Sequence, residues 1–75
     1  MSISKAQKEK LKILGERVKE LRNQKGYTLK VLSYSIDKDP QSIHRLEMGQ
    51  VNPSYLYLLE LCNGLEIEIS DLLKI

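Results

Sequence analysis

The chain is 75 residues long, of which 41% are hydrophobic and 29% charged, and its formal net charge is +2. This length fits one domain with a modest core, and no apolar run approaches the roughly 20 residues that cross a bilayer. The single cysteine excludes an internal disulfide, and the N-terminal stretch lacks the apolar segment of a secretory signal. We therefore expect a cytoplasmic protein that does not bind membranes.

The charge is unevenly distributed along the chain. Residues 1–45 contain eleven Lys or Arg against five Asp or Glu, a net charge of +6, whereas residues 46–75 contain one against five, a net charge of −4. Such a dipolar chain can present a basic face to a polyanion, but lysines that only keep a helix solvated would give the same pattern.

Five helices are predicted, and the first runs from about Lys5 to Lys25. Its apolar residues recur every three to four positions and form one face, lysines and glutamates fill most of the other, and Gly26 is a typical helix stop. The apolar face consists of Leu11, Leu14, Val18 and Leu21.

Two short helices follow, separated by a few polar residues. The first has Thr28 as its N-cap and ends near Ser35 or Ile36. The second has Asp39 as its N-cap and Pro40 at its first helical position, and it ends at Gly49.

Helices joined this closely favour a steep crossing angle. The crossing needs a small residue where the helices approach, which Ser33 supplies, and a turn residue that tolerates the left-handed conformation, which is Asp37. Leu29, Ile43 and Leu46 supply the inward aliphatic side chains. This spacing is typical of a helix-turn-helix.

The last third of the chain predicts two more helices. One runs from about Ser54 to Gly64, and a short one covers 71–74 with Ser70 as its N-cap. Residues 65–69 alternate like a strand without a partner strand. We expect an extended connector that places three side chains in the core, namely Leu65, Ile67 and Ile69.

Four segments keep the order and spacing of a known family: LGERVKELRNQKGYT (14–28), SIHRLEMG (42–49), NPSYLYLLELC (52–62) and ISDLL (69–73). Over residues 14–73 the chain resembles the phage repressor/Cro-like, or XRE-type, helix-turn-helix domains. The resemblance implies one all-α domain over 1–75, a compact five-helix, lambda-repressor-like DNA-binding fold. Residues 1–13 would form a basic leader and the start of the first helix.

The resemblance implies that the helix beginning at Pro40 reads the major groove of double-stranded DNA. Independently, inward Ile43 and Leu46 would leave polar side chains on or near the outward side, where Gln suits adenine and Arg suits guanine. The predicted base contacts are Gln41, Ser42, His44 and Arg45, with Pro40 at most touching a thymine methyl. The predicted phosphate contacts are Thr28, Lys30, Lys38, Gln50 and Asn52.

Two positions depart from the family pattern, and one pair matches it. Leu29 stands where many relatives place a phosphate-binding Gln, and Pro40 where many place a polar side chain facing DNA. Both changes leave the target site unpredictable. Arg22 and Glu47 match a family ion pair that ties the first helix to the end of the recognition helix, and we interpret the pair as structural.

The fourth helix predicts self-association. The run 55–59 is apolar around most of a helical circumference, and the positions of Leu56 and Tyr57 are usually polar in relatives. The leftover surface predicts a homodimer that reads a near-palindromic operator with recognition helices about 34 Å apart. The predicted dimer interface consists of Tyr55, Leu56 and Tyr57.

We expect no enzyme, because the chain holds one His and one Cys and assembles no metal set, phosphate-binding loop or catalytic triad. Cys62 is expected on an inward stripe with Tyr55, Leu58 and Leu59. Neither a cofactor nor a small-molecule substrate is expected. The prediction is a DNA-binding transcription regulator, specifically a repressor. The alternative is a helical or antitoxin-like protein-interaction module that uses the fourth helix.

Overall fold

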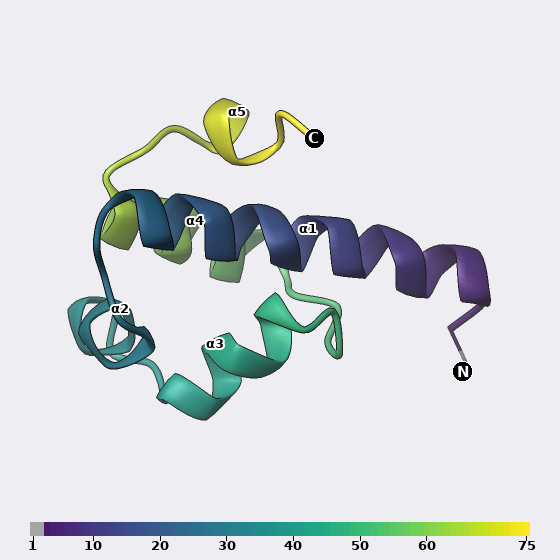
Figure 1. Ribbon diagram of the computed structural model, residues 1–75, viewed down its shortest axis with the longest axis horizontal. Helices are drawn as coiled ribbons and strands as arrows, with labels where there is room; N and C mark the ends of the chain where they lie inside the picture. Colours follow the sequence, from purple (N-terminus) through teal and green to yellow (C-terminus); the bar gives the residue numbers. More distant parts are fainter. Residues whose placement is uncertain (1–2) are drawn as a thin grey trace.

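The computed structural model describes residues 3–75, which form five helices and no strand: α1 (Lys5–Gln24), α2 (Leu29–Ser35), α3 (Pro40–Glu47), α4 (Tyr55–Leu65) and α5 (Ile69–Leu72). In Figure 1, α1 crosses the molecule as its longest helix, α2 and α3 lie on one side of it, and α5 lies on the other. The all-α class and the pairing of α2 with α3 as a helix-turn-helix are as predicted.

Local side-chain chemistry explains where the middle helices begin. The Thr28 Oγ1 accepts a hydrogen bond from the Val31 N–H at 3.1 Å, and the Asp39 Oδ1 accepts one from the Gln41 N–H at 2.9 Å. Both residues are the predicted N-caps, and Pro40 follows Asp39 at the first helical position.

Left-handed residues follow the first four helices. Glycine supplies two of them, and Asp37 (φ 56°) and Glu66 (φ 58°) supply the others. At Asp37 the chain reverses between α2 and α3, and the Lys38 N–H donates to the Ser33 carbonyl at 2.9 Å. The prediction that Asp37 adopts this conformation is confirmed.

The core receives buried apolar side chains from all five helices. Ser33, which belongs to α2, is almost fully buried, as expected of the small residue where α2 and α3 cross. Gly15 brings α1 close to the end of α3, since a Cβ there would lie 2.5 Å from the Glu47 carbonyl oxygen. The buried apolar residues are Val18, Leu21, Leu32, Ile43, Leu46, Leu61, Cys62, Leu65 and Leu72.

The structure corrects the prediction for residues 65–70. Leu65 is the last residue of α4 and Ile69 the first of α5, so no five-residue extended connector exists. The N-cap of α5 is Glu68 and not Ser70, and the Glu68 N–H donates to the Asp71 carboxylate at 3.3 Å. The alternating pattern arises because Leu65, Ile67 and Ile69 all pack against the core, as expected, while the chain turns.

Candidate nucleic-acid interface

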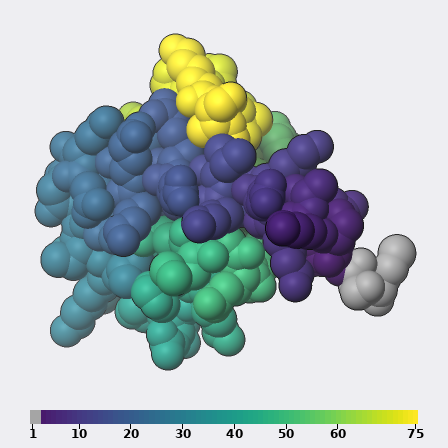
Figure 2. Space-filling model, turned by 45° about the vertical axis from the view of Figure 1, so that its right-hand side comes forward, coloured from purple at the N-terminus to yellow at the C-terminus, as the bar shows by residue number. Residues whose placement is uncertain are grey.

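Helix α3 has one buried and one exposed face. Ile43 and Leu46 are buried and fix the helix from behind, whereas Gln41, His44 and Arg45 are exposed. Figure 2 shows this part of the chain, coloured teal to green, at the lower edge of the molecule beneath α1. An amide, an imidazole and a guanidinium therefore share a face that a DNA groove could reach.

Ser42 and Pro40 contribute differently from the other predicted base contacts. Ser42 is half-buried, and its hydroxyl lies 2.8 Å from the Tyr57 hydroxyl of α4. The sequence placed it on or near the outward side, but the helical rotation that buries Ile43 also turns Ser42 toward α4. Pro40 is exposed at the start of α3. Contact of either residue with a base stays a prediction.

Arg22 of α1 and Glu47 of α3 form a bidentate ion pair. The Arg22 Nε lies 2.7 Å from one Glu47 carboxylate oxygen, and a second guanidinium nitrogen lies 3.0 Å from the other. Both side chains are buried, and Arg22 also donates to the Tyr27 carbonyl at 2.8 Å. The pair fastens the end of α3 to α1, so its role is structural.

The predicted phosphate contacts lie on both sides of α3. Thr28 and Lys30 are exposed at the start of α2, and Gln50 and Asn52 are exposed in the loop after α3. Lys38 is half-buried, because its ammonium lies 3.1 Å from a Glu60 carboxylate oxygen and 5.1 Å from the centre of the Tyr57 ring. Of the five, Lys38 therefore already has partners within the chain.

The first turn of α4 exposes apolar side chains to solvent, whereas the exposed residues that follow on this helix, Glu60 and Asn63, are polar. Tyr55 is 63% exposed and Leu56 is 69% exposed. The expectation that Tyr55 shares the inward stripe of Cys62 is wrong, since it lies at the exposed start of α4. Tyr57, in contrast, is half-buried against Ser42 and Lys38, so the available surface is smaller than the sequence suggested.

Two exposed residues beside this interface were missed by the sequence reasoning. Met48 is 51% exposed and follows Arg45 by three positions, so it extends the outward face of α3. Tyr34 is 90% exposed and lines a shallow notch with Lys30 and Pro40 between α2 and α3. Spacing from Arg45 could have identified Met48. Helical spacing could also have identified Tyr34, which falls on the opposite side of α2 from Leu29, Leu32 and Ser33.

Other kinds of site find little support in the described residues. Burial, with the nearby Asp71 and Glu68 charges, raises the pKa of the Cys62 thiol, so this side chain is a neutral part of the core at neutral pH. No group of three or more potential metal ligands gathers within residues 3–75. Over the same range, no helix has both the length and the apolar character that crossing a bilayer requires.

A short helix held from behind by α1 and α2, with polar side chains facing outward, defines a helix-turn-helix DNA-binding domain. The helix-turn-helix family model matches residues 18–72. A search among curated proteins finds no match. The chain belongs to the XRE-type helix-turn-helix family of DNA-binding transcription regulators.

Solved structures agree with this assignment. The restriction-modification controller protein C.AhdI from Aeromonas hydrophila superposes with a TM-score of 0.82 at 33% identity, over 84% of this chain and 96% of that chain. The clp gene regulator ClgR from Corynebacterium glutamicum gives a TM-score of 0.81 at 28% identity, over 84% of this chain and 82% of that chain. A second ClgR structure gives 0.80 at 28% identity, with 84% and 67% covered.

Proposed function

We propose that the chain binds a specific double-stranded DNA sequence by placing α3 in the major groove. The observation that carries this proposal is the division of α3 into an anchored and a free face. Gln41 and Arg45 lie one helical turn apart on the free face, where they can address neighbouring base pairs. Bidentate hydrogen bonds of Gln to adenine and of Arg to guanine would supply the specificity.

Selection of bound duplexes from a random pool tests whether α3 recognises a specific DNA sequence. We expect one enriched motif, and we expect Arg45→Ala and Gln41→Ala each to reduce affinity for it by about 1–3 kcal/mol while relaxing the sequence preference at one position. Lys74→Ala is the control, because Lys74 is exposed near the C-terminus and pairs with Asp71. If Arg45→Ala binds the selected duplex as the unchanged chain does, α3 is not the recognition helix.

The same proposal includes a homodimer formed through the exposed part of α4. Tyr55 and Leu56 support it, because side chains of this size lose unfavourable contact with water when they pack on a second copy. A two-fold dimer would set two α3 helices about 34 Å apart and so read a near-palindrome.

Sedimentation equilibrium tests the dimer. Leu56→Asn is expected to weaken self-association at least about tenfold, which corresponds to about 1.4 kcal/mol. Val31→Thr, at a half-exposed position on α2, should leave self-association unchanged. An unchanged chain that stays monomeric at hundreds of micromolar would contradict the dimer without affecting the role of α3.

We further propose that binding represses transcription, because a promoter covered by the protein is closed to polymerase. A reporter placed behind the selected site should lose expression when the protein is present. A rise in expression would contradict repression and leave DNA binding intact. The salt dependence of binding separates a DNA-binding protein from a protein-interaction module. Affinity that depends on phosphate contacts falls steeply with added salt, whereas apolar binding to a partner protein should hardly change.

A further inference from the structure

The N-terminal part of α1 lies outside the matched family region, which begins at residue 18. Residues 5–12 carry four lysines and one glutamate. None of the ion pairs among residues 3–75 involves Lys8 or Lys12. Positive charge is therefore concentrated on a helical segment that precedes the family match and carries none of the predicted DNA contacts.

This segment packs on the loop that follows the recognition helix. A Cβ at Gly49 would lie only 2.7 Å from the Lys12 Cα, so the loop and α1 are in direct backbone contact. Gly49 also has a φ of 73°, which lets the chain leave α3 at this point, and the Gln50 N–H donates to the Arg45 carbonyl at 2.9 Å. Loop and helix consequently present one continuous surface.

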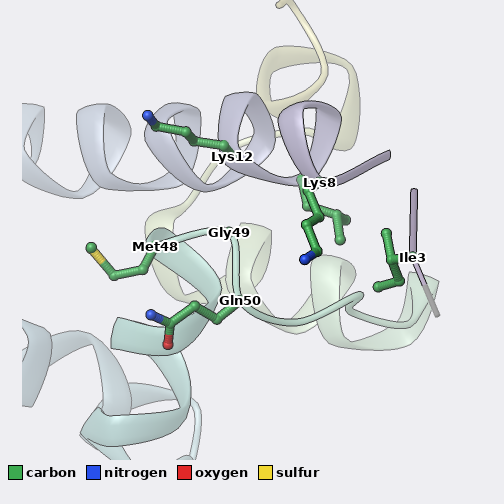
Figure 3. Close-up of a pocket in the computed structure, with 7 residues that line it drawn as sticks. Ile3, Lys8, Lys12, Met48, Gly49 and Gln50 are labelled. Carbon is green, nitrogen blue, oxygen red and sulfur yellow. The ribbon is translucent and has the colours of Figure 1, made fainter. Parts of the chain in front are cut away.

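Between them lies a notch of about 440 Å³, which we call the basic notch. In Figure 3, Lys8 points from α1 toward the loop that carries Gly49 and Gln50, and Lys12 runs along α1 above Met48. No acidic residue contributes to the lining. The basic notch is lined by Ile3, Lys8, Leu11, Lys12, Met48, Gly49 and Gln50.

The position of the basic notch relates it to the reading face of α3. Met48 and Arg45 lie three residues apart in the chain and are both exposed, so the lining of the notch continues the proposed base-reading surface onto α1. Just beyond the base pairs read by a recognition helix, a protein meets the sugar-phosphate backbone, where Lys and Gln side chains are suitable ligands.

We propose that the basic notch binds the DNA backbone at the edge of the half-site, with Lys8 and Lys12 neutralising phosphates that flank the base pairs read by α3. The proposal rests on the proposed DNA-binding function and extends the contact surface to the first two turns of α1. These lysines would add affinity independent of sequence and would lengthen the footprint on one side of each half-site.

The double variant Lys8→Gln/Lys12→Gln tests the proposal. Both lysines are exposed on a helix, so the replacements keep hydrogen-bonding capacity and helix propensity and remove only charge. Binding is measured on a mixed-sequence duplex of roughly 30 base pairs, about three helical turns, across a series of salt concentrations. The slope of log affinity against log salt should become shallower by about 1 for each phosphate that is no longer neutralised, hence by about 2.

Lys10→Gln/Lys74→Gln is the matched control. It removes the same amount of charge from another part of the surface. Lys74 and Ile13 line a depression on the opposite side of α1, and Lys10 lies one helical turn before Ile13. If the lysines act only through long-range attraction, both double variants will change the slope of log affinity against log salt by the same amount. Equal slopes in the two variants would overturn the proposal. A slope unchanged by Lys8→Gln/Lys12→Gln would overturn it as well.

A footprint on the selected duplex gives a second readout. Lys8→Gln/Lys12→Gln should lose the outermost backbone protections and keep those over the motif, and it should select the same motif. If only the basic-notch proposal is wrong, Arg45→Ala will still relax the sequence preference. If no variant changes binding to any duplex, the proposed function fails instead.

Discussion

The C-terminal end of α3 packs against α1, whereas its N-terminal half contacts α4, and the two contacts are built from different chemistry. Against α1, a buried bidentate pair between Arg22 and Glu47 accompanies a close backbone approach at Gly15. Buried charges with good hydrogen-bond geometry interact strongly, and removal of one partner is costly because the other charge stays buried.

Against α4, the contacts are partly open to water. The Ser42 and Tyr57 hydroxyls lie 2.8 Å apart, and Lys38, which precedes α3, reaches Glu60 at 3.1 Å. Half-buried polar contacts of this kind contribute about 1 kcal/mol each, less than a buried charge pair loses when one partner is removed. The two ends of the recognition helix are therefore held with unequal strength. The end that carries Gln41 packs on α2 as well, and its further contact with α4 is the weaker of the two compared here. We therefore expect changes in α4 to alter DNA reading without unfolding the domain.

The strongest test of this difference removes Glu47. Glu47→Ala leaves the Arg22 guanidinium buried without its carboxylate, and we expect a loss of about 3–5 kcal/mol in the free energy of unfolding measured in urea. Glu20→Ala is the control, because Glu20 pairs with Arg17 at the surface and should cost under about 1 kcal/mol. Arg22→Met/Glu47→Leu should be more stable than Glu47→Ala. Similar losses from the two single changes would mean that the α1–α3 contact is no stronger than a surface pair.

Gly15→Ala tests the close approach of α1 and α3. The added Cβ would meet the Leu46 and Glu47 carbonyl oxygens, which are backbone atoms and cannot move as a flexible side chain can. We expect a net loss of about 2 kcal/mol, after the helix preference of Ala is subtracted from the overpacking cost. Gly26→Ala is the contrast, since it meets open space and should cost about 1 kcal/mol for its left-handed backbone alone. A Gly15→Ala chain as stable as the unchanged protein would rule out a tight contact.

The smallest expected effect concerns the α3–α4 contact. Tyr57→Phe removes one hydroxyl, and we expect a loss of about 0.5–1.5 kcal/mol in unfolding free energy, with a similar loss from Ser42→Ala. A double-mutant cycle should show coupling between the two changes. Tyr34→Phe, on a side chain of α2 that is 90% exposed, should leave the unfolding free energy unchanged. The informative readout is the sequence preference at the base pair next to Gln41, which should relax in Tyr57→Phe. Additive losses and an unchanged preference would remove Tyr57 from the support of α3.

Much of the helix-turn-helix could be predicted from the sequence because its signals are local. Thr28, Asp39 and Pro40 set helix starts through hydrogen bonds or backbone angles within three residues. Spacing alone also indicated that Ile43 and Leu46 face inward. The error at Ser70 has the same origin. Ser is a preferred N-cap residue and Glu is not, so local signals favour Ser70, whereas Ile69 packs against the core as the first residue of α5 and the helix begins after Glu68.

The sequence by itself determined the first four helices, the inward and outward faces of α3 and, through family resemblance, the Arg22–Glu47 pair. Only the tertiary structure decided that Ser42 turns to Tyr57, that Lys38 is held by Glu60, and that Lys8 and Gln50 line one notch. Caps and amphipathic faces are set by neighbours a few residues apart. These contacts join residues 15 or more positions apart, and their existence depends on how α1, α3 and α4 settle against a shared core.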